Sequence, residues 1–168
     1  MKSIYLLRHA KSDWNASSGS DHERPLNKRG IRSALGMGKH LSSNTVPPAL
    51  ILCSTAIRTR ETLALIQKGS NWDSEAVFES FLYHATLQTV KERIQALPVD
   101  LESVMIIGHQ PTTGEVASWF LGGKQIGVPT CAFIHLRLDI MDWKELNPGH
   151  ATLHQYVIPS QFMSGVND

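Results

Sequence analysis

Short apolar runs alternate along this chain with longer segments that are apolar on one face only. The apolar runs have the length and composition of strands and cover residues 3–7, 50–53, 75–81, 104–108, 132–138 and 152–157. Between most of them, apolar residues recur at helical spacing, over about residues 28–41, 55–67, 87–97 and 112–120. This alternation predicts an α/β fold of three layers, α/β/α, in which a mainly parallel sheet has helices on both faces. A turn around residues 147–149 joins the last two strands, which predicts an antiparallel edge.

Residues that commonly cap helices stand at the start of several predicted helices. Asn27 is the predicted N-cap of the first helix, and Ser54 or Thr55 that of the second. Thr112 and Glu115 have the spacing of a capping box, in which two side chains satisfy backbone N–H groups at a helix start. Thr112 and Glu115 are therefore expected to be structural.

Length and composition restrict the class of protein. The chain has 168 residues, which fits a single domain spanning residues 1–168. Its 16 basic and 15 acidic residues give a net charge of +1, so no overall field favours a nucleic acid partner. No apolar run approaches the roughly 20 residues of a membrane helix, and five residues between Lys2 and Arg8 are too few for a signal-peptide core. Two cysteines make neither a disulfide framework nor a zinc site, so a cytoplasmic location is expected.

Charged and polar side chains follow three of the predicted strands. Arg8 and His9 end the first strand, Arg58 lies in the first turn of the helix after the second strand, and His109 follows the strand at 104–108. The carboxyl ends of parallel strands share one edge of a sheet, where α/β proteins hold ligands. These four residues are therefore expected to converge on one pocket. Arg24, on the loop above the first strand, can join them.

Such a pocket has a definite chemistry. Three arginines and a helix N-terminus make a strong site for a dianionic phosphoryl group. A histidine among cations is disfavoured from taking a proton, so His9 is expected to stay neutral and able to accept a phosphoryl group covalently. The arginines would stabilise the charge on the phosphoryl oxygens, which His109 can also bond. Without an Asp-rich or Cys/His cluster, no metal or other cofactor is expected.

Other interpretations of the same residues remain open. Each histidine, taken alone, could be a hydrogen-bonded residue of the core, although two at predicted strand ends favour a shared site. The chain could also be a phosphatase of a small phosphoester metabolite. From a different class, it could be a catalytically silent module that binds phosphate or a phosphoprotein, but a pure binder has no need of a nucleophile.

Taken together, these motifs resemble the histidine phosphatase superfamily, which has the phosphoglycerate mutase-like fold. The resemblance covers about residues 3–123, and its motifs follow the family's order: Arg8-His9 with Ser12 and Trp14-Asn15, then Arg24-Pro25-Leu26-Asn27 and Gly30, then residues 53–62, then Gly108-His109-Gln110-Pro111. The short length, the Arg-Pro-Leu stretch and residues 82–85 are similar to the small bacterial branch of SixA-like phosphohistidine phosphatases.

The resemblance assigns roles to individual positions. It implies that His9 is the phospho-acceptor and that Arg8, Arg58 and His109 complete the phosphate pocket. It further implies that Arg24 adds a contact typical of the small branch. Asn15 matches a phosphate-contacting position of the mutase-like members. The implied substrate is a phosphohistidine on a partner protein, with a small phosphorylated molecule as the alternative.

Two positions depart from the family's pattern. Ala10 stands where many members have glycine, so the backbone after the nucleophile is less free. Larger members carry an acidic proton donor after the third strand, whereas residues 81–84 of this chain, Phe-Leu-Tyr-His, contain no carboxylate. His84 is the candidate proton donor in that place. The identity of the acid bears directly on which substrate the enzyme can use.

Overall fold

The six strands of the structure form one sheet. The structure is a computed structural model and describes residues 1–15 and 19–163. The strands are β1 (Lys2–Arg8), β2 (Leu50–Ser54), β3 (Glu75–Glu79), β4 (Ser103–Gly108), β5 (Phe133–Leu138) and β6 (Ala151–Val157). Their order in the sheet is β3-β2-β4-β1-β5-β6. The first four of these are mutually parallel, whereas β5 is antiparallel to β1 and β6 to β5. The predicted α/β fold with its antiparallel edge is confirmed.

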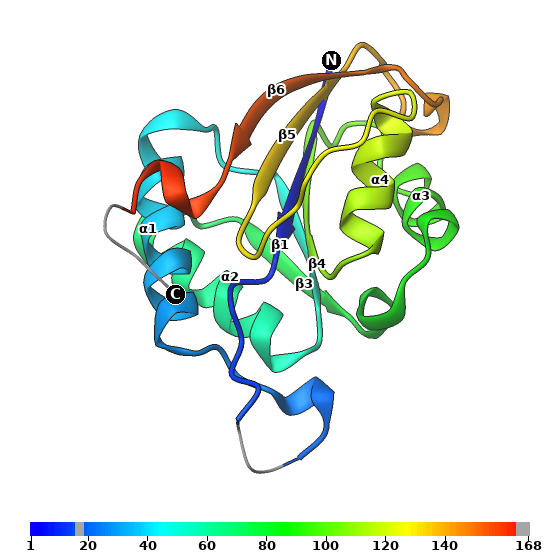
Figure 1. The fold of residues 1–168 in the computed structure, drawn as a ribbon. Helices are drawn as coiled ribbons and strands as arrows, with labels where there is room; N and C mark the ends of the chain where they lie inside the picture. The colour runs from blue at the N-terminus through cyan, green and yellow to red at the C-terminus, as the bar shows by residue number, and fades with distance from the viewer. Residues whose placement is uncertain (16–18, 164–168) are drawn as a thin grey trace.

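Helices cover both faces of the sheet (Figure 1). Helices α1 (Lys28–Asn44) and α2 (Ile57–Ser70) lie on one face, and α3 (Leu87–Gln95) and α4 (Thr112–Phe120) on the other. The sequence of β1 explains why both faces must be covered. Ile4 and Leu6 are buried in the cluster under α3 and α4, while Tyr5 and Leu7 are buried in the cluster under α1 and α2. Successive side chains of a strand point to opposite faces, so an apolar run without polar alternation requires a layer on each side.

Within residues 1–15 and 19–163, four short 3-10 helices accompany the sheet and the α-helices: η1 (Asp21–Glu23), η2 (Ser80–His84), η3 (Trp143–Glu145) and η4 (Pro159–Gln161). Two of them correct the predicted element boundaries. The strand predicted over residues 75–81 ends at Glu79, and η2 follows it directly. The predicted turn around 147–149 is the end of a longer connection, residues 139–150, which contains η3. Within the described residues, no helix is both long and apolar enough to cross a membrane.

The predicted helix caps were partly wrong. Asn27 does cap α1, since its side chain accepts a hydrogen bond of 2.8 Å from the backbone N–H of Gly30. The N-cap of α2, however, is Ala56, which makes no side-chain cap. Helix α4 begins after Pro111, again without a side-chain cap, and the hydroxyl of Thr112 instead donates to the Ala85 carbonyl at 2.6 Å. The predicted capping box is therefore absent from α4.

The register of the central strands sets their carboxyl ends level with one another. Arg8 of β1 pairs with Gly108 of β4, so His9 and His109 are the next residues on two adjacent strands. Cys53 of β2 pairs with Ile107 of β4, which brings Ser54 to the same level. In Figure 1 this edge lies at the lower end of β1 and β4, where the blue segment that follows β1 extends beyond the sheet.

Candidate active site

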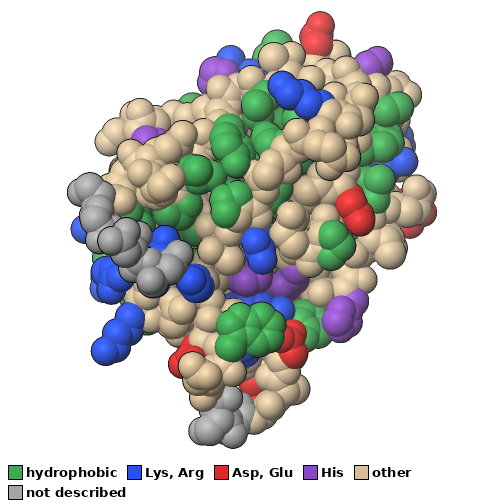
Figure 2. Space-filling view, in the orientation of Figure 1, with side chains coloured by type: hydrophobic (Ala, Val, Ile, Leu, Met, Phe, Trp, Pro, Cys, Tyr) green, Lys and Arg blue, Asp and Glu red, His purple; other side chains and the backbone are tan. Residues whose placement is uncertain are grey.

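A pocket of about 670 Å³ opens at this edge of the sheet. It brings together five of the residues predicted from the sequence, which come from the ends of β1 and β4, the first turn of α2 and the loop before α1: Arg8, His9, Arg24, Arg58 and His109. Figure 2 shows histidine and basic (Lys or Arg) side chains gathered in a hollow on the lower half of this face, with acidic and hydrophobic side chains beside it. The convergence expected from the strand order is therefore present in the fold.

Two other predicted residues lie outside the lining of this pocket. Asn15 is exposed, and its backbone N–H bonds the Asp13 carboxylate at 2.9 Å. His84 is also exposed, and its ring packs against that of Tyr83 with centroids 4.1 Å apart. The roles predicted for Asn15 and His84 stay predictions.

His9 is a buried group of the pocket, with 7% of its surface exposed. Its Nδ1 lies 2.7 Å from the Ala10 carbonyl oxygen. Because a carbonyl only accepts, the ring proton is assigned to Nδ1, which leaves the lone pair on Nε2. The backbone is fixed on both sides, since the His9 N–H donates to Gly108 and the His9 carbonyl accepts from Cys131. Burial, together with the positive charges of nearby arginines, lowers the pKa of His9 from 6.5 to about 4, so the ring is neutral at neutral pH.

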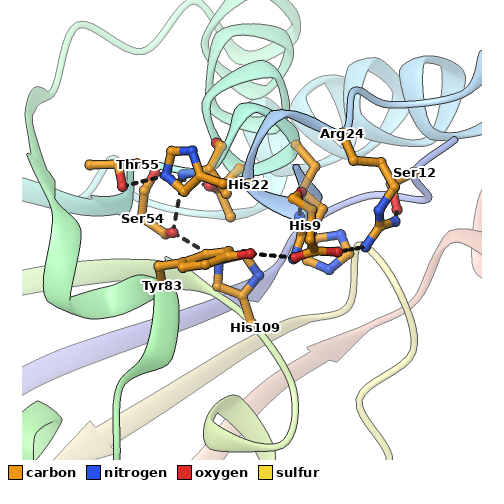
Figure 3. A network of polar contacts seen from close by, with 12 residues as sticks. His9, Ser12, His22, Arg24, Ser54, Thr55, Tyr83 and His109 are labelled. Atoms are coloured by element: carbon orange, nitrogen blue, oxygen red, sulfur yellow. Dashed lines mark hydrogen bonds and ion pairs between the residues drawn. The ribbon is translucent and has the colours of Figure 1, made fainter. Parts of the chain in front are cut away.

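His109 is the immediate neighbour of His9 on the floor of the pocket (Figure 3). The two ring centroids are 5.3 Å apart, and Nε2 of His109 lies 2.8 Å from the Ser54 hydroxyl. When that hydroxyl donates to Nε2, the ring proton is on Nδ1. Nδ1 is buried and has no hydrogen-bond partner within the described part of the chain. Burial, and then the nearby His9 and Arg58, lower the pKa of His109 to about 3. A neutral His109 therefore keeps one N–H that has no partner among the described residues.

In each of the three arginines the protein holds at least one outer nitrogen. Arg8 donates to the Val128 carbonyl at 3.0 Å, and Arg24 donates to Ser12 and to the Asp21 carboxylate. Arg58, in the first turn of α2, donates to the Asp21 carbonyl at 2.8 Å and to its carboxylate at 3.1 Å. In each arginine Nε is buried and has no hydrogen-bond partner among the described residues. Guanidinium groups that the protein already holds beside the pocket suit a phosphoryl group, since their positive charge needs no reorganisation.

Asp21 is the residue that the sequence analysis missed. Besides Arg24 and Arg58, its carboxylate accepts a hydrogen bond of 2.5 Å from the Tyr83 hydroxyl. The Tyr83 hydroxyl, with help from the two arginines, holds the pKa of Asp21 well below its usual range. The one local signal was the spacing of Asp21 and Arg24, three residues apart in a segment interpreted as a loop. Its contacts with Arg58 and Tyr83 join residues far apart in the chain.

Two aromatic contacts lie at the pocket or next to Asp21. The ring centroid of Trp14 lies 3.5 Å from the guanidinium carbon of Arg24, although Trp14 is 77% exposed. His22 bonds the Thr55 hydroxyl at 2.9 Å and meets the ring of Tyr83 edge-on (Figure 3). These contacts hold the η1 segment against α2 and η2, so Arg24 and Asp21 are placed by packing as well as by charge.

Comparison with known proteins agrees with this geometry. Residues 4–79 match the family model of the histidine phosphatase superfamily (branch 1). An uncharacterized protein of Mycobacterium tuberculosis is 34% identical over 163 residues, which cover 91% of this chain and 99% of that protein. The chain belongs to the histidine phosphatase superfamily.

Among solved structures, this histidine phosphatase is similar to SixA proteins. One from Agrobacterium tumefaciens, assigned as the phosphohistidine phosphatase SixA, superposes with a TM-score of 0.81 at 28% identity and covers 94% of this chain and 98% of the other. The protein histidine phosphatase SixA complexed with tungstate gives a TM-score of 0.82 at 24% identity, with coverage of 96% and 99%. This chain is therefore a phosphatase of the phosphoglycerate mutase-like fold.

Proposed function

We propose that this phosphatase hydrolyses phosphohistidine on a partner protein, without a metal ion, through a covalent phosphohistidine on His9. The single observation that carries the proposal is the state of His9. Its ring is neutral, its proton is held on Nδ1 by the Ala10 carbonyl, and its other nitrogen is available in a pocket lined by arginines. A neutral imidazole nitrogen in that position is a competent phosphoryl acceptor.

The remaining groups suit the charge that develops during phosphoryl transfer. As Nε2 of His9 forms a bond to phosphorus, the phosphoryl oxygens carry negative charge that must be stabilised. Arg8, Arg24, Arg58 and His109 line the pocket and are the side chains placed beside those oxygens. In the second step, the oxygen of a water molecule bonds to phosphorus. The electron pair of the broken P–N bond returns to Nε2 of His9, and the two protons of the water leave with the product, which is released as dihydrogen phosphate.

The choice of substrate follows from the groups that can deliver a proton. An alkyl phosphoester leaves as an alkoxide, which needs a proton in the transition state, whereas an imidazole already protonated on its second nitrogen leaves without one. Among the described residues that line the pocket, Asp21 is the one carboxylic acid, and its lowered pKa keeps it ionised. The site is therefore better suited to a phosphoramidate than to an alkyl ester.

The test compares three leaving groups in one enzyme. We expect kcat/KM to be highest for a phosphohistidine peptide, lower for an aryl phosphate and lowest for a simple alkyl phosphate, with a spread bounded by the ~10²–10⁴-fold contribution of a general acid. EDTA in a parallel series should leave all three values unchanged, because the arginines supply the positive charge. An alkyl phosphate hydrolysed as fast as the peptide would instead favour a small phosphoester as the substrate. A loss of activity to EDTA that a divalent metal restores would overturn the metal-free mechanism.

The covalent step has its own test. After a rapid quench at alkaline pH, the parent enzyme incubated with radiolabelled substrate should carry phosphate that is stable to alkali and labile to acid. His9→Ala should show no such label and no turnover, while its circular dichroism spectrum stays that of the parent. Substantial turnover by His9→Ala would rule out the covalent intermediate.

A further inference from the structure

Asp21 is unexpected in a pocket built for an anion. Its side chain is 49% exposed, and among the described residues that line the pocket it is the one acidic group. A carboxylate beside Arg24 and Arg58 competes with a phosphoryl group for their charge. If the pocket only had to bind phosphate, this residue would weaken it. We therefore expect Asp21 to act on the part of the substrate other than its phosphoryl group.

The position of Asp21 relative to His9 indicates which part. In an in-line displacement the leaving group departs on the side of phosphorus opposite the attacking nitrogen. His9 lies at the enclosed floor of the pocket, with 7% of its surface exposed, so the leaving group departs towards the opening. The half-exposed carboxylate of Asp21 lies on that rim, next to Tyr83, whose ring meets the ring of His109 edge-on with centroids 5.5 Å apart.

The carboxylate also has an acceptor site to spare. Oδ2 receives two donors, Arg58 and the Tyr83 hydroxyl, whereas Oδ1 receives one, from Arg24. A carboxylate oxygen can accept two hydrogen bonds, so within the described part of the chain Oδ1 keeps one acceptor position. Three donors fix the carboxylate in place before a substrate arrives, and a group held in this way can select a partner at little entropic cost.

We propose that Asp21 is a specificity-determining residue whose carboxylate accepts a hydrogen bond from the N–H of a departing imidazole. This role rests on the proposed function, the hydrolysis of phosphohistidine, and makes Asp21 the residue that discriminates between leaving groups. As Nε2 of His9 bonds to phosphorus, the P–N bond of the substrate breaks and its electron pair stays on the imidazole nitrogen. The proton on the other ring nitrogen remains there, against Asp21, and the ring departs as neutral imidazole. A phenolate or alkoxide offers no such N–H and meets a like charge instead.

The closing experiment measures a ratio of two activities. Phosphoimidazole carries the imidazole leaving group without any peptide, and 4-nitrophenyl phosphate carries a phenolate. We expect Asp21→Asn to lower the ratio of their kcat/KM values ~10–100-fold, the scale of one hydrogen bond to a charged group. Glu23→Gln removes an exposed carboxylate from the same turn, outside the pocket lining, and should leave the ratio unchanged. Tyr83→Phe keeps the charge of Asp21, so it should change the ratio less than Asp21→Asn does.

The outcomes separate this inference from the function on which it rests. If Asp21→Asn slows both substrates by the same factor, Asp21 only positions Arg24 and Arg58, and the inference is wrong while the proposed function stands. If the ratio falls as expected but the parent enzyme hydrolyses alkyl phosphates faster than phosphohistidine peptides, the proposed substrate is wrong and the role of Asp21 stands. A parent enzyme that prefers 4-nitrophenyl phosphate to phosphoimidazole would overturn both.

Discussion

The imidazole rings of His9 and His109 lie side by side, with centroids 5.3 Å apart and planes inclined by 50°. They follow adjacent parallel strands whose register sets them level. Each is a partly or fully buried imidazole beside the other and beside cations, so a proton on either ring would be unfavourable. The pair is therefore expected to remain uncharged over the whole physiological range of pH.

Nuclear magnetic resonance can test this expectation directly. The folded pKa values of about 4 for His9 and about 3 for His109 lie below the usual 6.5, so neither ring should titrate between pH 8 and pH 5. The two ring signals can be assigned by their disappearance in His9→Ala and His109→Ala. A His9 signal that titrates near pH 6.5 would contradict the assigned neutral nucleophile.

The same shifts predict how stability depends on pH. A histidine with a lowered folded pKa binds a proton more readily when the chain is unfolded, so the free energy of unfolding falls as the pH drops from about 6.5 towards 4. For His9 the loss at pH 5 should be on the order of 1–2 kcal/mol. Urea unfolding of the parent and of His9→Asn at pH 7.5 and pH 5 measures it. The variant should lose less stability between the two pH values, and an equal loss would show that His9 is not the titrating group.

The positions of Arg8, His9 and His109 could be predicted because they depend on a simple rule. Arg8 ends a buried strand, and His9 and His109 each follow one. Parallel strands place their carboxyl ends on one edge of the sheet, and the register of β1 and β4 sets these ends level. Asp21 and Tyr83 could not be found in this way. Asp21 lies in η1 and Tyr83 in η2, and the two residues are 62 positions apart in the sequence. No local sequence pattern predicts a contact between them.

The wrong helix caps have a related cause. Ser54 or Thr55 was predicted to cap α2, but the Ser54 hydroxyl lies 2.8 Å from Nε2 of His109 and the Thr55 hydroxyl 2.9 Å from Nε2 of His22. Thr112 was predicted to cap α4, but its hydroxyl bonds Ala85, at the end of η2. In each case the hydroxyl bonds a residue that is distant in the sequence and not the backbone N–H groups in the first turn of its helix. Sequence spacing alone does not predict such tertiary contacts.

Arg58 should be far more sensitive to substitution than its neighbour Arg60. Two nitrogens of Arg58 donate to Asp21, and its Nε has no partner among the described residues. Arg60 is exposed, donates to the Thr55 carbonyl and lies outside the pocket lining. We expect Arg58→Ala to lower kcat/KM for an aryl phosphate by ~10²–10³, the scale for one preorganised donor, and Arg60→Ala to leave it near that of the parent. Arg58→Lys should restore little of the lost activity, because an ammonium group cannot reproduce the planar set of N–H donors of a guanidinium group. A near-normal Arg58→Lys would mean that only net charge matters there.

Gly30 should be required for the approach of α1 to the loop after β1. A Cβ at this position would collide with the backbone carbonyl of Lys11, two residues after the nucleophile, and neither backbone can yield cheaply. We expect Gly30→Ala to cost about 1–3 kcal/mol in urea unfolding and to lower kcat. Gly36→Ala is the matched control in the same helix, since its Cβ would meet a Phe162 side chain rather than backbone. Equal stability and activity in the two variants would argue against the close approach.

His84 offers the last test, because it decides whether the site has a proton donor after all. It is exposed, lies outside the pocket lining and packs its ring against Tyr83. A general acid must reach the leaving-group oxygen within hydrogen-bond distance, so a ring held outside the pocket should contribute nothing to alkyl ester cleavage. We therefore expect His84→Ala to change kcat/KM for an alkyl phosphate and for an aryl phosphate by the same small factor. If the alkyl phosphate alone slows, by the ~10²–10⁴-fold of a lost general acid, His84 moves into the pocket during turnover and alkyl phosphoesters return as substrates.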